Sequence, residues 1–94
     1  MLWILSIGET RYAGTERQLL EKCKKMYFMA RVGSTEKVGN SLRITVSNGA
    51  TEKTFVAYKK GSDSYYIPKL EAKTEYRLIG ARDRGYAYEK VGTF

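Results

Sequence analysis

The sequence contains no histidine, and it has a single cysteine, a single proline and a single tryptophan. Without histidine the most versatile general base and the commonest metal ligand are missing. One cysteine cannot form an intrachain disulfide or a thiolate metal site. The carboxylates show no spacing that indicates a catalytic pair. We therefore expect a protein that is not an enzyme and that binds neither a cofactor nor a metal.

Long hydrophobic runs are also missing. The apolar stretch at residues 1–7 is too short to span a bilayer, and it lacks the basic start of a signal peptide. We therefore expect no membrane partner and a cytoplasmic location. Aromatic and β-branched residues are plentiful and no low-complexity segment occurs, which predicts one compact folded domain over residues 1–94.

Basic residues and tyrosines are what the chain has in excess. Seventeen Lys and Arg face ten Asp and Glu, giving a net charge of +7, and eight residues are tyrosine. Both halves of the chain are basic, so any cationic patch must be assembled by folding. Cations that neutralise phosphates and rings that stack on bases indicate a binding protein with an anionic partner. Solubility alone is the other explanation of the charge.

The first strand and the helix have clear local patterns. The apolar run at residues 2–7 is typical of a strand that is buried on both faces and central in its sheet. Residues 8–15 are expected to form a connecting loop. Thr15 and Gln18 have the spacing of a capping box, and Leu19, Leu20 and Cys23 follow at helical intervals. We expect Cys23 to be a buried core residue.

Residues 26–32 leave two alternatives open. They either continue the helix to Gly33 or form a strand with Phe28, Ala30 and Val32 on one face. We favour the strand, which requires a very tight link from the helix.

Beyond residue 33 the pattern is that of a β meander. Strands are predicted at 42–47, 53–59, 64–67, 76–79 and 86–91. Asn48-Gly49 predicts a hairpin with a type I′ turn. A two- or four-residue loop places Phe55 and Ala57 on the face of Leu42, whereas a three-residue loop places Val56 and Tyr58 there. The predicted fold class is α+β. One helix in the N-terminal half packs on a strongly bent, mostly antiparallel sheet, or on a small barrel, of six or seven short strands.

One segment resembles a known motif. Arg84-Gly85-Tyr86-Ala87-Tyr88 is similar to the start of the longer ribonucleoprotein motif of RNA-recognition-motif domains, and Leu2-Trp3-Ile4 is similar to its shorter companion. Glu89 and Val91 depart from that motif, which has an apolar and an aromatic residue there. The resemblance implies that Tyr86 and Tyr88 share an exposed sheet face and stack on bases.

These patterns predict a small, basic, non-catalytic nucleic-acid-binding protein. RNA or single strands are favoured over duplex, because no recognition helix is evident. The predicted nucleic-acid-binding residues are Arg77, Arg82, Arg84, Tyr86, Tyr88, Lys59 and Lys60. The alternative is a protein-interaction module that meets an acidic protein surface, such as a small inhibitor or adaptor of a host protein complex encoded by a virus or mobile element. The oligomeric state is left open.

Overall fold

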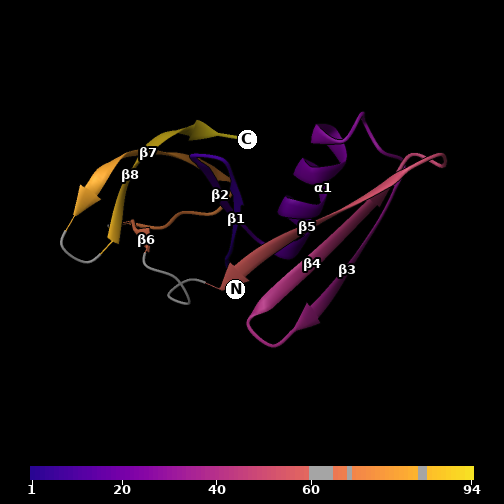
Figure 1. Cartoon of the computed structure of the whole chain (residues 1–94), viewed down its shortest axis with the longest axis horizontal. Coiled ribbons are helices and arrows are strands. Elements are labelled where there is room, and N and C mark those ends of the chain that lie inside the picture. Colours follow the sequence, from indigo (N-terminus) through magenta and orange to yellow (C-terminus); the bar gives the residue numbers. More distant parts are fainter. Residues whose placement is uncertain (60–64, 68, 83–84) are drawn as a thin grey trace.

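The computed structural model describes residues 1–59, 65–67, 69–82 and 85–94. These residues form one helix and one sheet (Figure 1). The helix is α1 (Glu16–Met26), and the strands are β1 (Trp3–Ile7), β2 (Thr10–Gly14), β3 (Val32–Val38), β4 (Ser41–Ser47), β5 (Glu52–Lys59), β6 (Tyr65–Tyr66), β7 (Thr74–Arg82) and β8 (Gly85–Thr93).

The sheet order is β3-β4-β5-β1-β2-β7-β8-β6, and only the short β6 pairs in parallel, with β8. The predicted α+β class, with one helix on a mostly antiparallel sheet, is therefore confirmed. Of the two forms expected, the open sheet is the correct one, because β3 and β6 stand at its two edges and do not meet in the described part of the chain.

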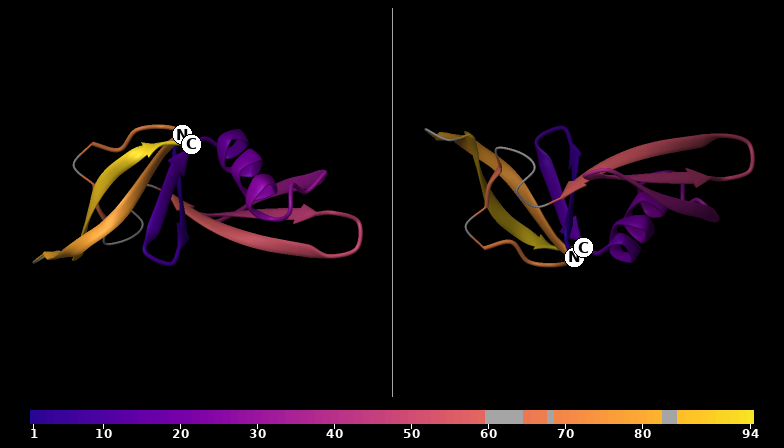
Figure 2. Two further views of the ribbon diagram at one scale, coloured as in Figure 1. Left: turned by 90° about the horizontal axis from the view of Figure 1, so that it is seen from above. Right: turned by 90° about the horizontal axis from the view of Figure 1, so that it is seen from below.

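The sheet carries a hydrophobic cluster on each of its two faces. Trp3 and Leu5 of β1 belong to the cluster under α1, whereas Ile4 between them points to the other face and pairs with Ala13 of β2. Ala13 belongs to a second cluster, whose buried members are Ala13, Tyr76 and Tyr88. The prediction that the first strand is central and buried on both faces is thus correct. Figure 2 shows the sheet bending sharply along β1 and β2.

The larger cluster joins α1 to β4. Leu42, Ile44 and Val46 alternate along β4 and are fully buried against Leu19 and Cys23 of the helix. Side chains on the solvent face of β4 alternate with them, as the period of two in the sequence predicted.

The hairpin between β4 and β5 sets the register of this cluster. Its loop has four residues, 48–51, and Leu42 lies opposite Ala57 as expected for a loop of that length. The type I′ turn is wrong, however, because only Gly49 of the Asn48-Gly49 pair has a positive φ, 95°. The Asn48 side chain instead accepts hydrogen bonds from the backbone N–H groups of Ala50 and Thr51.

Residues 8–15 do not form the expected loop. Gly8, with φ 59°, turns the chain back, and residues 10–14 become β2, which pairs with β1 along its whole length. The local sequence did not predict this strand, because Thr10 and Arg11 are polar and interrupt any apolar alternation. The strand is buried by residues distant in sequence, since Tyr12 packs against the cluster under α1 and Ala13 belongs to the second cluster.

The favoured strand at residues 26–32 is also wrong, as is a helix that continues to Gly33. The helix ends at Met26, and Phe28 and Met29 both take left-handed conformations, with φ 52° and 54°. The chain is held there by the Ala30 N–H, which donates to the Lys24 carbonyl over 2.8 Å. Ala30 is buried, so it anchors the turn, and the next strand, which was not predicted as such, begins at Val32.

Candidate nucleic-acid interface

The sequence predicted a basic cluster around residues 77–84, and of its three arginines the structure describes the side chain of Arg77 alone. Arg77 is exposed on β7 and pairs with Glu89 across the hairpin, while Glu75 lies two positions away on the same face. The strand positions next to Arg77 on this face are therefore occupied by two acidic residues. Arg82 lies at the end of β7 with its side chain outside the described atoms, and Arg84 falls outside the described residues.

The two tyrosines of the motif have different environments. Tyr86 has 51% of its surface exposed and stays available for contact with a partner. Tyr88 is only 5% exposed, and the Arg11 guanidinium group lies 5.0 Å from the centre of its ring. Ile67 and Leu70 pack against the cluster that contains Tyr88. The exposed position that the motif implied for Tyr88 is therefore not found, because its side chain is buried in this second cluster.

The remaining predicted contacts lie at the end of β5. Lys59 is half-buried opposite Trp3 of β1, and its backbone N–H donates to the Asn40 carbonyl. Lys60 lies outside the described residues. Arg77 and Tyr86 are on opposite faces of the β7–β8 hairpin, because Arg77 pairs with Glu89 and Tyr86 alternates from it along β8.

A different group of cations comes together beside α1. A groove of about 390 Å³ runs between the helix, the turn before β7 and the end of the chain. It is lined by Arg17, Gln18, Glu21, Lys22, Lys25, Lys73 and Phe94. Four of these residues are cations and one is an acid, and Glu21 already has Lys24 as an ion-pair partner at 3.4 Å. The groove is therefore strongly electropositive.

Local structure explains how α1 presents its cations. Thr15 accepts a hydrogen bond from the Gln18 N–H, and the Gln18 side chain accepts one from the Thr15 N–H, so the predicted capping box is formed. With the start of the helix set, Leu19 and Cys23 face the sheet. Lys22 and Lys25 then lie away from that core, at the positions that line the groove.

The opposite wall of the groove comes from residues distant in sequence. The Phe94 N–H donates to the Lys73 carbonyl over 3.1 Å, which ties the end of the chain to the turn before β7. The Phe94 ring packs edge-on against Tyr12, with ring centres 5.5 Å apart. The Lys22 ammonium lies 5.0 Å from the Tyr12 ring centre and 5.9 Å from that of Phe94. These contacts hold Lys22 at the groove.

The ring of Tyr12 helps to position Lys22 at the groove and does not contribute charge to it. Burial, with a smaller effect of the nearby Glu75 carboxylate, raises the pKa of the Tyr12 phenol above its usual value. The phenol thus stays neutral at physiological pH, and the charge of the groove comes from its lysines and arginine. What the groove offers to a ligand is positive charge, since its two rings already contact each other and Lys22.

Sequence reasoning missed this groove for an identifiable reason. Lys22, Lys24 and Lys25 were visible as a basic run on a helix, but such a run by itself is also typical of a solvated helix face. Lys73 and Phe94 join it only through the fold. No local signal connects these residues.

The turn after α1 is a second exposed feature. Phe28 and Met29 are 79% and 71% exposed, although both are large and apolar. The Tyr27 ring packs against Phe28 with ring centres 5.3 Å apart, and its hydroxyl donates to the Thr51 hydroxyl at 2.6 Å. The two side chains are thus displayed on an anchored turn.

The described residues give little support for a metal site or a reactive thiol. They contain no group of three or more Cys, Asp or Glu side chains placed to hold a metal ion. Cys23 is fully buried, and this burial raises the pKa of its thiol to about 12, against a weaker opposing effect of Lys22. No helix in the described part of the chain has the length and apolar character needed to cross a membrane.

Comparison with known protein families, curated proteins and solved structures finds no match to this chain.

Proposed function

We propose that this protein is a small nucleic-acid-binding protein without catalytic activity, and that the groove beside α1 holds the phosphate backbone. The observation that carries the proposal is the convergence of Arg17, Lys22, Lys25 and Lys73 on one groove with a single, already paired acid. Ammonium and guanidinium groups bind phosphates, and binding releases counterions from the polymer.

The extent and setting of the cations favour a single-stranded polymer or RNA. Arg17 and Lys25 are eight residues apart on α1, about 12 Å along the helix axis, which is more than one small anion occupies. The helix packs against β1, β2, β3 and β4 and does not project from the molecule. An inserted recognition helix of the kind that reads the major groove of duplex DNA is therefore not favoured.

Tyr86 remains a candidate for stacking on bases, because half of its surface is exposed on β8. Arg82, Arg84 and Lys60 were predicted from the sequence as phosphate contacts, and in this proposal the groove beside α1 takes that role instead. The groove supplies charge in this proposal, and Tyr86 supplies the aromatic contact.

A fluorescence-anisotropy titration tests the proposal with single-stranded RNA, single-stranded DNA and duplex of equal length. We expect the single strands to bind more tightly than duplex, and their affinity to fall by at least tenfold between about 50 and about 200 mM salt, since several phosphates are neutralised. Undetectable binding at the lower salt concentration, or affinity that does not depend on salt, would refute the proposal.

The exposed turn after α1 favours a second candidate function, a protein-interaction module. Phe28 and Met29 are large, apolar and exposed, and both have left-handed backbone conformations. Exposed aromatic side chains are typical of binding hot spots. Lys25 and Arg31 are exposed near this turn in sequence, so the matching surface is apolar with an acidic rim.

Replacing Phe28 and Met29 together by serine separates the two functions. If the turn binds a protein, affinity purification with nuclease treatment recovers one stoichiometric partner with the wild-type chain and loses it with this variant. Oligonucleotide affinity stays within about twofold of wild type, because no charge changes. Equal recovery of the partner by both chains would exclude the turn as its docking point.

A further inference from the structure

The edge strand β3 is open for pairing along its whole length. β3 (Val32–Val38) pairs with β4 in an unbroken register of seven residue pairs, and no other described strand lies on its outer side. Residues 32–38 contain no proline and no bulge. The backbone groups on the outer side of such a strand are a template for another strand.

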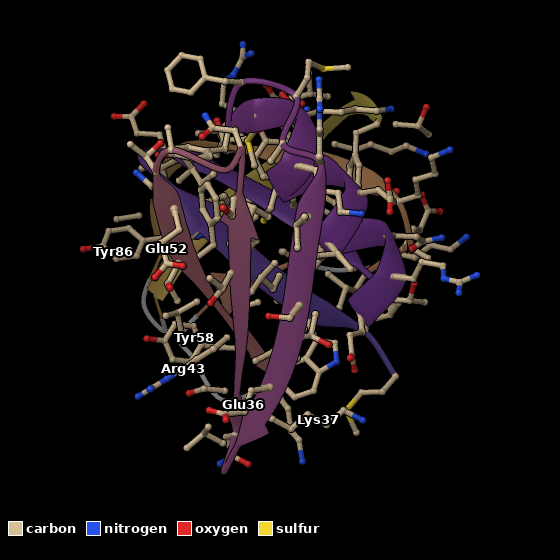
Figure 3. All side chains as sticks on the ribbon, turned by 90° about the vertical axis from the view of Figure 1, so that its right-hand side faces the viewer. Glu36, Lys37, Arg43, Glu52, Tyr58 and Tyr86 are labelled. Atoms are coloured by element: carbon tan, nitrogen blue, oxygen red, sulfur yellow. The ribbon has the colours of Figure 1, made fainter. Side chains whose placement is uncertain are left out.

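The usual protection of an edge strand is weak here. Lys37 points to the α1 side, where its ammonium lies 3.6 Å from the Glu16 carboxylate, while Glu36 points to the opposite side of the strand (Figure 3). Glu36 is therefore the one charged side chain of β3 that points away from α1. Val32 and Val38, at the two ends of the strand on the same face as Glu36, are 64% and 44% exposed.

We propose that a second copy of this chain binds at β3 as an antiparallel strand, with a two-fold axis through Thr35. In this register Val32 faces Val38 of the second copy, Ser34 faces its Glu36, and Gly33 faces its Lys37. Two valine pairs form and no like charges are opposed. Parallel pairing in register would instead place Glu36 against Glu36 and Lys37 against Lys37, which is unfavourable.

The surface beside β3 fits the same occupant. A groove of about 620 Å³ lies between α1 and β3 and is lined by Glu16, Arg17, Leu20, Glu21, Lys24 and Thr35. Two acids and two bases balance there around the half-buried Leu20. A two-fold axis perpendicular to the sheet places the α1 of the second copy on the same face, across this groove. A surface with both signs of charge is then complementary to its own copy.

This inference does not depend on nucleic-acid binding, and its first test is the mass in solution. Sedimentation equilibrium is expected to give a mass twice that of the 10.7 kDa chain, decreasing to the monomer on dilution. A monomer at every concentration, or a mass that grows without limit, overturns the proposal.

Cross-linking tests the register. Val32→Cys and Val38→Cys variants are expected to form a disulfide when mixed under mild oxidation, because these positions are opposed. Each variant alone leaves its cysteines about 20 Å apart, six residues along the strand, which is too far for a disulfide. The buried Cys23 does not interfere. Equal cross-linking of a single variant with itself would show a different pairing.

A pair of charge variants at Ser34 gives a matched control. Ser34 is exposed, so neither change disturbs the core. Ser34→Glu places a carboxylate opposite Glu36 at two symmetric points and is expected to raise the dimer dissociation constant about tenfold. Ser34→Lys is expected to lower it or leave it unchanged. The same effect from both variants, or none from either, contradicts the proposed register.

Discussion

Replacing Lys22, Lys25 and Lys73 by glutamine is expected to weaken binding to single-stranded oligonucleotides about 100-fold at about 0.1 M salt. Each phosphate that a cation neutralises on a single strand contributes about 0.7 to the exponent of the salt dependence, or about fivefold in affinity at this salt concentration. Removing three cations together multiplies three such factors. The slope of log affinity against log salt also decreases, by about 2.

The matched control removes the same charge from the cluster that the sequence predicted. Replacing Arg77, Arg82 and Arg84 by glutamine also lowers the net charge from +7 to +4, since three cations become neutral. If the groove holds the phosphates, this variant loses only about threefold in affinity, through long-range electrostatics. A greater loss in the arginine variant than in the lysine variant would move the interface to the β7–β8 turn.

The second large effect is expected in the core under α1. Leu19→Ala should lower the free energy of unfolding by about 3 kcal/mol, because a fully buried side chain is replaced by a cavity. For a domain of this size the melting temperature then falls by roughly 15 °C. Thermal unfolding followed by far-UV circular dichroism measures the change.

An exposed residue supplies the control for this experiment. Ile79 is 54% exposed on β7, so Ile79→Ala should change the free energy of unfolding by less than about 0.5 kcal/mol. The fluorescence of Trp3 should report the same transition as circular dichroism in every variant, because β1 contributes to the clusters on both faces. Two separate transitions, or a Leu19→Ala effect as small as that of Ile79→Ala, would contradict this description of the core.

Tyr86 and Tyr88 show which properties of the candidate site the sequence could predict. Alternation along β8 correctly placed Tyr86 and Tyr88 on one face, but it carried no information about what covers that face. Ile67 and Leu70, from a segment about twenty residues away, pack against the cluster that contains Tyr88, whereas Tyr86 is exposed. A motif of five residues therefore predicted the direction of the side chains and not their accessibility.

The strands that were missed have a related cause. β2 and β3 carry polar residues at many positions, and neither has the regular apolar alternation of β4. β2 becomes a strand because β1 and β7 pair with its two sides, and β3 because it pairs with β4. Pairing with a neighbour, which a local pattern does not contain, outweighs the weak propensity of the residues themselves.

What the sequence determined by itself are the features that depend on neighbours within a few residues: the cap and buried face of α1 and the alternation of β4. The sequence left the length of the β4–β5 loop open, and the structure gave it four residues. Only the tertiary structure decided which strands lie side by side, that Tyr88 is buried, and that Lys73 and Phe94 meet the lysines of α1. Local geometry selects the conformation of a short segment through its own periodicity, whereas a surface made from distant residues exists only after the whole sheet has folded around both of its hydrophobic clusters.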